Sequence, residues 1–175
     1  MKQCCFCFPT PLFGAAKSLL LSKFQLVPFQ LVRLETRPSS PDGASEVTAR
    51  DLLRNVLRMR PDRIILGEVR SSEAIEMLQA MGTGHDGSMA TLHANAPRDA
   101  LERLEMLIGL HGFSTDLQAV RRFISGAVHI VVHTARRSDG KRKVVSVCEV
   151  AGMEGPTYSL REIFSDDETE KRRVV

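Results

Sequence analysis

The sequence has no tryptophan, one tyrosine and four cysteines among its 175 residues. Cys4, Cys5 and Cys7 crowd the first seven positions, and Cys148 stands alone in an apolar run. This distribution fits neither a disulfide framework nor paired zinc knuckles, so we expect a reducing compartment. No apolar stretch approaches the roughly eighteen residues of a membrane-spanning helix. Lys17 interrupts the short apolar run near the N-terminus, and no cleavage motif follows, so we expect no secretory signal.

Excess charge of one sign is also missing. Charged residues make up 26% of the chain and hydrophobic residues 43%, which is typical of a globular protein. The net charge of +3 is too small to indicate a nucleic acid partner. The dense basic runs, Ala135–Lys143 and Lys171–Arg173, are more typical of a solvated hairpin tip and a chain end.

From Leu31 onward, short apolar runs alternate with amphipathic segments. The apolar runs predict strands at 31–37, 63–69 and 89–93, then a hairpin of 127–135 and 143–150 around Asp139 and Gly140, and an edge strand at 157–164. The amphipathic segments predict helices that begin at Thr48 and end before Pro61, and at 71–84, 95–112 and 114–126. This order indicates an α/β fold with a mostly parallel sheet and an antiparallel C-terminal hairpin.

The predicted helices have start signals and apolar faces. Thr48 and Asp51 have the spacing of a capping box, a serine begins the helix at 71–84, and Asn95 is the expected N-cap before Pro97. The apolar faces are formed by Leu52, Leu53, Val56 and Leu57 in the first helix and by Leu101, Leu104 and Ile108 in the third. The strand at 63–69 is nearly continuous in apolar residues, which predicts burial on both faces.

Two polar side chains follow neighbouring strands. Glu68 ends one apolar strand and His93 ends the next, and the carboxyl ends of parallel strands meet at one rim of a sheet. A carboxylate there needs a cation or donor, which indicates a site. Three alternatives remain open. Glu68 can pair with Arg70 or Arg63, His93 can be a core histidine, and His85, Asp86 and His93 can bind a metal in a hydrolase.

The segment LLRNVLRMRPDRIILGEVRSSEAIEMLQAMGTGHDGSMATLHANAPRDALERLEMLIG, residues 52–109, resembles the C-terminal half of the type II/IV secretion ATPases, and within them the CpaF-like ATPases of Tad (Flp) pilus assembly. The similarity extends over residues 31–164. It implies a RecA-like P-loop ATPase core that uses ATP and Mg²⁺, forms a homo-hexamer, and works in the cytoplasm at the inner membrane with pilus or secretion platform proteins.

The same resemblance implies roles for particular residues. Glu68 would be the acidic residue of the Walker B segment and hold Mg²⁺ through water, and His93, in the His box at 84–95, would contact the γ-phosphate region. His85 would support that loop. The remaining expected cofactor contacts are Arg33, Arg37 and Arg70.

The sequence also departs from that family. A phosphate-binding loop has the pattern G-x-x-x-x-G-K-[ST], and these 175 residues do not contain it; their Gly-Lys pair, Gly140–Lys141, is followed by Arg142. Residues 1–30 resemble nothing in the family, so we expect a segment outside the domain at 1–30, a partial ATPase domain at 31–165 and a charged tail at 166–175. A truncated gene, a misread start or a frame change would produce this pattern.

Two functions follow from these departures. The chain is either part of a hexameric ATPase that powers pilus assembly or secretion, or a non-catalytic remnant or accessory subunit that keeps the interaction surfaces. Because the loop and its central strand are missing from the sequence, we expect the isolated chain neither to bind nor to hydrolyse ATP. We also expect an open edge at the strand 63–68 and a tendency to aggregate.

Overall fold

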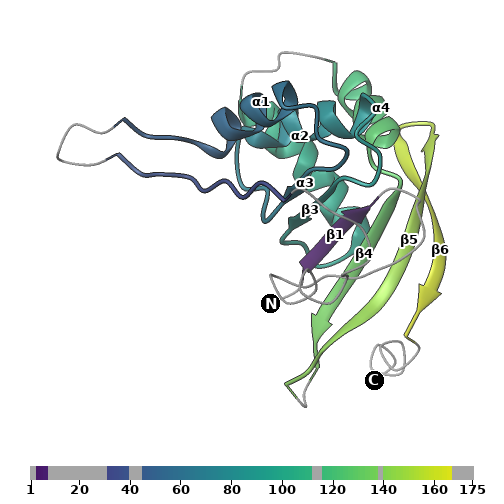
Figure 1. Ribbon diagram of the computed structural model, residues 1–175. Helices are drawn as coiled ribbons and strands as arrows, with labels where there is room; N and C mark the ends of the chain where they lie inside the picture. Colours follow the sequence, from purple (N-terminus) through teal and green to yellow (C-terminus); the bar gives the residue numbers. More distant parts are fainter. Residues whose placement is uncertain (1–2, 8–30, 40–44, 112–115, 138–139, 167–175) are drawn as a thin grey trace.

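The computed structural model describes residues 3–7, 31–39, 45–111, 116–137 and 140–166. Figure 1 shows how its helices and strands are arranged. The helices are α1 (Ala49–Arg58), α2 (Glu73–Gly82), α3 (Pro97–Leu110) and α4 (Leu117–Ala127). The strands are β1 (Gln3–Cys7), β2 (Ile65–Leu66), β3 (Met89–Leu92), β4 (Ile130–Arg136), β5 (Arg142–Glu154) and β6 (Thr157–Ser165).

The strands form one sheet in the order β2-β3-β1-β4-β5-β6. The pair β2–β3 is parallel, and each of the other neighbouring pairs is antiparallel. The mixed α/β class is therefore confirmed, whereas the expectation of a mostly parallel sheet is wrong for the described residues. The reason is partly local, since β4, β5 and β6 are joined by short turns that force neighbours to run in opposite directions.

The other reason is β1, which lies in the middle of the sheet. Its backbone pairs antiparallel with β3 on one side, where Cys5 faces Thr91, and with β4 on the other, where Cys5 faces Val132. Gln3–Cys7 is therefore part of the sheet rather than apart from it. The expectation that residues 1–30 stand outside the domain stays a prediction for 8–30, which lie outside the described residues.

The strand expected at 63–69 is reduced to two residues at an edge of the described sheet. Ile65 is 60% exposed, so the prediction of burial on both faces is wrong. The open edge that we expected at this strand is present among the described residues. Ile64 before β2 and Val69 after it are buried.

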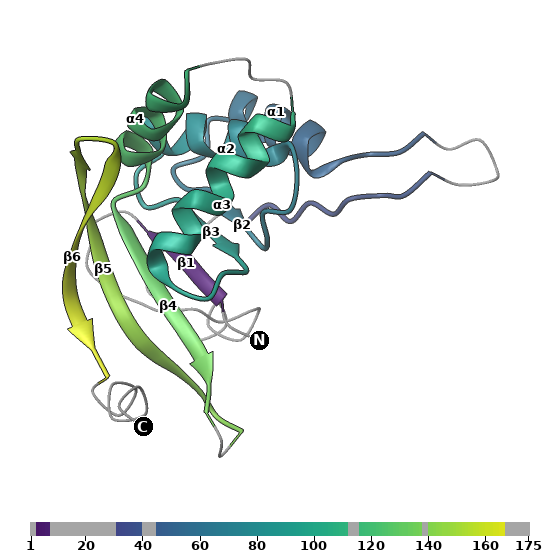
Figure 2. The ribbon, with the colours of Figure 1, turned by 180° about the vertical axis from the view of Figure 1, so that it is seen from behind.

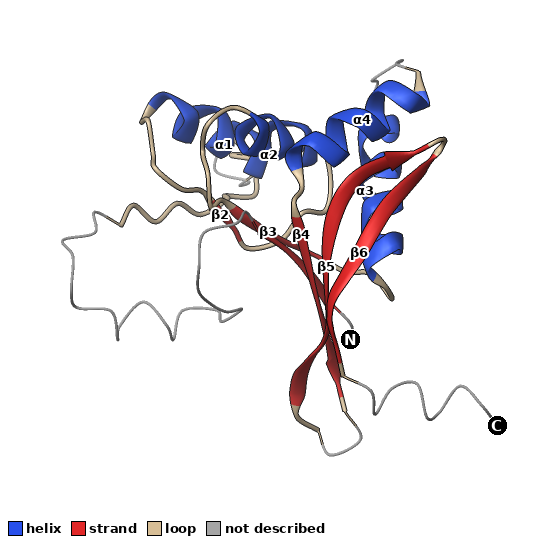
Figure 3. Cartoon of the chain, turned by 90° about the vertical axis from the view of Figure 1, so that its right-hand side faces the viewer, coloured by secondary structure: helices blue, strands red, loops and turns tan. Residues whose placement is uncertain are grey.

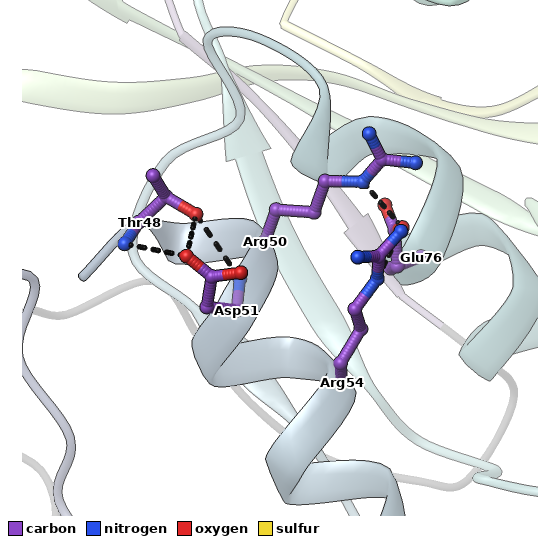
Figure 4. A network of polar contacts seen from close by, with 5 residues as sticks. All are labelled: Thr48, Arg50, Asp51, Arg54 and Glu76. Carbon is purple, nitrogen blue, oxygen red and sulfur yellow. Dashed lines mark hydrogen bonds and ion pairs between the residues drawn. The ribbon is translucent and has the colours of Figure 1, made fainter. Parts of the chain in front are cut away.

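Helix α1 begins as its sequence predicts. The Thr48 side chain accepts a hydrogen bond from the backbone N–H of Asp51, and the Asp51 carboxylate accepts bonds from the N–H and hydroxyl of Thr48 (Figure 4). The hydrogen bond from the Thr48 side chain holds the pKa of Asp51 below its usual value. This reciprocal pair satisfies donors that the first helical turn leaves without partners.

A buried carboxylate fixes α1 against α2. Glu76 on α2 is almost fully buried, and its Oε1 accepts bonds from Arg50 Nε at 2.6 Å and Arg54 Nε at 3.2 Å (Figure 4). Removal of one partner from a buried ion pair is strongly destabilising, because a charge is then left in a poorly solvated place. The two arginines thus set the position of α1 on α2.

The core lies between the helices and the sheet. Leu101, Leu104 and Ile108 of α3 are all buried, which confirms the predicted face, and they join Met77 of α2 and Leu92 of β3. Figure 2 shows α3 crossing in front of the strands. None of the helices in the described residues combines the length and apolarity that crossing a bilayer requires.

Several local expectations are corrected. Residues 31–37 form no strand. They belong to an extended arm, residues 31–39 and 45–47, that projects from the body of the molecule (Figures 1 and 2). Within this arm the backbone makes a single bridge, between Arg37 and Val47. Ala96, not Asn95, is the N-cap of α3. Ser72, the N-cap of α2, makes no side-chain capping bond, and the Glu73 carboxylate instead accepts from the backbone N–H groups of Arg70 and Ser71, just before the N-cap.

Candidate functional site

The candidate site lies at the carboxyl ends of the parallel strands β2 and β3. The strands pair through Ile65 with Met89 and Leu66 with Ala90. Past the end of β2, the Val69 N–H donates to the carbonyl of Thr91 in β3 at 2.8 Å, and the Thr91 hydroxyl donates to the Gly67 carbonyl at 2.5 Å. These bonds keep the two chain segments side by side past the ends of the strands. The residues that follow them emerge together.

Glu68 and His93 are in contact, which confirms the predicted convergence. His93 Nε2 lies 3.0 Å from Glu68 Oε1, and Arg70 Nη2 lies 2.5 Å from Glu68 Oε2. The Glu68 side chain is 23% exposed and that of Arg70 is 75% exposed. The hydrogen bond that Arg70 donates to the Glu68 carboxylate raises the pKa of Arg70 above its usual value. The Glu68–Arg70 ion pair, which was an alternative expectation for Glu68, is thus also present. The Glu68 carboxylate contacts both Arg70 and His93.

A second carboxylate fixes the chain that follows Arg70. Glu73 is buried, and its Oε1 accepts bonds from the backbone N–H of Arg70 at 2.5 Å and of Ser71 at 3.0 Å. The Ser71 hydroxyl lies 2.9 Å from His111 Nε2 at the end of α3. The chain just before α2 is therefore tied to α2 through Glu73 and to the end of α3 through His111.

The loop before β3 is held by one serine. Ser88 is fully buried, and its hydroxyl donates to the His85 carbonyl at 2.7 Å while accepting from the Ile64 N–H at 3.0 Å. Gly87 has a φ of 83°, and a Cβ there would come within 2.8 Å of Arg63 Nε. A side chain at Gly87 would therefore be strained and would displace Arg63.

The structure does not bring His85 to the Glu68–His93 pair. His85 precedes β3 and His93 follows it, and a strand of this length spans about 10 Å at about 3.3 Å per residue. His85 and His93 therefore lie toward opposite ends of β3. Among the described residues, no group of three His, Cys, Asp or Glu side chains could hold a metal. The proposed hydrolase site of His85, Asp86 and His93 is contradicted by this arrangement.

Arg33 and Arg37 lie on the extended arm rather than at the pair. The Arg37 guanidinium donates to the Ser45 carbonyl on the facing side of the same arm, at 3.1 and 3.3 Å. All of residues 31–39 are exposed. Contacts of these arginines with phosphate stay a prediction, and within this chain they do not meet Glu68.

Sequence reasoning missed the side chains that position the pair. Ser88, Thr91 and Glu73 each bond to backbone groups of the segments that carry Glu68, Arg70 and His85. A small hydroxyl residue directly before an apolar strand was the available signal for Ser88. It is a weak signal, because such residues are also common in solvated loops.

The chemistry open to the pair follows from its groups. A partly exposed carboxylate can accept protons or hold the hydration shell of a hard cation, and an adjacent exposed guanidinium suits a phosphate or carboxylate. Glu68 and Arg70 could therefore hold the hydration shell of a cation and contact an anionic group such as a phosphate. The sequence contains no glycine-rich loop with a lysine, the pattern that cradles the phosphates of a nucleotide.

The chain is similar to proteins of known families. A family model described as type II/IV secretion system protein matches residues 24–163. A putative conjugal transfer protein of Mycobacterium tuberculosis is 41% identical over 130 residues, which cover 74% of this chain and 36% of that protein. The type IV secretion system protein PtlH of Bordetella pertussis is 37% identical over 114 residues, 63% of this chain and 34% of that protein.

Similarity extends to a solved structure, the VirB11 ATPase of the Brucella suis type IV secretion system in complex with sulphate. The two are 31% identical with a TM-score of 0.50, and the match covers 72% of this chain and 34% of the other. The mixed α/β fold is thus similar to that of VirB11. This chain spans about a third of the length of these relatives.

Proposed function

The chain belongs to the type II/IV secretion system protein family, and from that premise we propose that it forms the metal and γ-phosphate half of a secretion ATPase site. The observation that carries the proposal is the 3.0 Å contact of Glu68 and His93 at the carboxyl ends of two parallel strands. ATP hydrolysis in a longer protein that contains this segment would drive type IV secretion or conjugal transfer.

In this proposal, Glu68 corresponds to the Walker B acid and His93 to the histidine of the His box. The carboxylate of Glu68 would orient water and hold Mg²⁺ through the ion's own hydration shell. His93 would place an N–H or a lone pair next to the terminal phosphate, and Arg70 would supply positive charge to it. Bound Mg²⁺ would supply charge neutralisation of the phosphates.

The finer assignments also belong to the proposal. A CpaF-like role in Tad pilus assembly, a homo-hexamer, and attachment to inner-membrane platform proteins are supported by the motif similarity at 52–109 alone. In a hexamer, Arg33 and Arg37 would reach a neighbouring subunit's nucleotide, because the arm that carries them projects from the body (Figure 1).

A grafted protein tests the site. Residues 31–164 replace the aligned region of the mycobacterial conjugal transfer protein, and MgATP turnover and binding are measured. We expect Glu68→Gln to abolish turnover with nucleotide binding retained, and His93→Ala to lower kcat by more than it weakens binding.

The control for these variants is Asp86→Asn, at the other end of β3, which should leave turnover and nucleotide binding unchanged. Wild-type turnover by Glu68→Gln would remove Glu68 from the site, and a folded graft without turnover would contradict the whole proposal.

The second candidate, a non-catalytic remnant or accessory subunit, is favoured by the absence of a phosphate-binding loop from the sequence. Calorimetric titration of the 175-residue chain with MgATP, combined with phosphate release and light scattering, separates the two. We expect neither binding nor turnover by the isolated chain. Micromolar binding with turnover in a monodisperse sample would show that this chain is itself an ATPase.

A further inference from the structure

The two edges of the described sheet differ in how well they are protected against a further strand. Figure 3 shows β2 and β6 at opposite sides of the sheet. On β6, Arg161 and Glu162 are exposed, and the register with β5 shifts at two places. Charged side chains and bulges at an edge hinder the pairing of another strand. β2 consists of Ile65 and Leu66, neither of them charged, so it is the less protected edge.

The backbone of β2 offers hydrogen-bonding groups to a further strand. Ile64 bonds inward, because its N–H donates to the Ser88 hydroxyl at 3.0 Å and its carbonyl accepts from the Met89 N–H at 2.8 Å. Successive residues of a strand direct these groups to alternate sides, so the N–H and carbonyl of Ile65 face the outer edge. A Cβ at Gly67 would meet no atom within 4 Å. The described residues therefore leave room for a strand beside β2.

Residues 31–37 have the features of a strand that lacks a sheet. Within the described part of the chain their backbone pairing is the bridge of Arg37 and Val47, which exchange hydrogen bonds of 3.0 and 2.8 Å. Val32 and Leu34 are exposed, and they alternate with charged side chains. An exposed, extended segment of this kind can add to a sheet edge, where main-chain bonds provide affinity and alternate side chains provide specificity.

The same chain thus carries an open edge and a segment that could fill it. Within one copy the two do not pair, because the arm leads away from the body of the molecule (Figures 1 and 2). The Arg37 guanidinium also bonds to the Ser45 carbonyl, which ties the two sides of the arm to each other. Two copies related by a two-fold axis can each place residues 31–37 on the β2 edge of the other. Such an exchange is closed, because no further β2 edge or arm is left to recruit a third copy.

We propose that the chain forms a two-fold dimer in which residues 31–37 of each copy add as a strand to β2 of the other. The added strand would bond to the N–H and carbonyl of Ile65. Val32 and Leu34 lie two positions apart and so share one face of an extended segment, from which they would cover the exposed Ile65 side chain. The dimer needs no nucleotide, so its test is separate from that of the proposed ATPase.

Sedimentation velocity of the whole chain over a range of concentrations tests the dimer. Ile65→Lys places a charge on the edge, and Leu34→Pro removes an N–H from the added segment. We expect each variant to weaken dimerisation at least about tenfold. The matched controls are Leu110→Lys, which adds the same charge at an exposed position of α3, and Leu34→Val, which keeps the N–H. Both controls should dimerise like the wild type, and circular dichroism checks that every variant keeps its fold.

A mixture of the two variants distinguishes an exchange from other modes of association. Neither variant can form the paired dimer with itself, but the arm of the Ile65→Lys variant and the β2 edge of the Leu34→Pro variant are both intact. We expect heterodimers in the mixture at a concentration where each variant alone is monomeric, measured by native mass spectrometry. A monomeric wild-type chain, an equal loss from Leu110→Lys, association that Leu34→Pro leaves unchanged, or no heterodimer in the mixture would overturn the proposal.

Discussion

At one end of the sheet, β2 and β3 have two and four residues and run parallel, whereas at the other end β4, β5 and β6 have seven, thirteen and nine and run antiparallel. The short pair makes few backbone hydrogen bonds, so side chains such as Ser88 and Thr91 hold it in register. The long strands hold themselves through the backbone ladder. The candidate site lies in the region that depends on individual side chains.

The strand β1 joins these two regions, and breaking it should have the largest effect. A proline at position 5 removes an N–H from a strand paired on both sides. We expect Cys5→Pro to lower the free energy of unfolding by about 3 kcal/mol or more, measured by urea denaturation. Cys5→Val keeps the donor and is the control, with a much smaller change. Equal stability of the two variants would mean that β1 does not hold the sheet together.

Ser88 tests the side-chain-dependent region by itself. Ser88→Ala leaves the Ile64 N–H without its buried partner and removes one of the two bonds to the His85 carbonyl, which keeps the Ser88 N–H, so we expect a loss of about 2 kcal/mol in unfolding free energy. Hydrogen exchange should show faster exchange at Ile64, with Val131 in β4 unchanged. Ser125→Ala, which removes an exposed hydroxyl bonded to the Arg122 carbonyl, should cost less than about 0.5 kcal/mol. Uniform loss of protection across the sheet would contradict the distinction between its ends.

Tyr158 reports on the antiparallel region with no change of sequence. It is the sole tyrosine of the chain, and burial beside α3 raises its pKa well above the usual value. The fold favours the neutral phenol, so its contribution to stability is complete below pH about 10 and is lost as pH rises above the pKa of the unfolded chain. We expect phenolate absorbance to appear only with loss of ellipticity. Ionisation near pH 10 in a chain with native ellipticity would contradict this burial.

The sequence was sufficient where one local interaction decides the outcome. The capping box of Thr48 and Asp51 and the buried face of Leu101, Leu104 and Ile108 depend on residues within one helix, and both are present. The convergence of Glu68 and His93 was also predictable, because parallel neighbours end at one rim. Their roles in hydrolysis stay a prediction.

Where distant segments compete for the same position, the sequence was not sufficient. Residues 31–37 alternate like a strand, yet they pair only once, with Val47 of their own arm. Ile65 has the pattern of a buried strand but is exposed, because β2 lies at an edge of the described sheet. Whether an apolar run is central or at an edge depends on which segments pair beside it, and periodicity carries no information on that choice.

The sequence by itself determined the start of α1, the apolar face of α3, the basic run at 135–143 and the order of polar residues after each strand, since these depend on neighbours within a few positions. Only the tertiary structure decided that Gln3–Cys7 lies between β3 and β4, and that Ser88 and Glu73 hold the segments that carry Glu68 and Arg70. Backbone donors and acceptors are alike in every residue, so strand partners follow from which segments together bury the most apolar surface with all buried polar groups bonded.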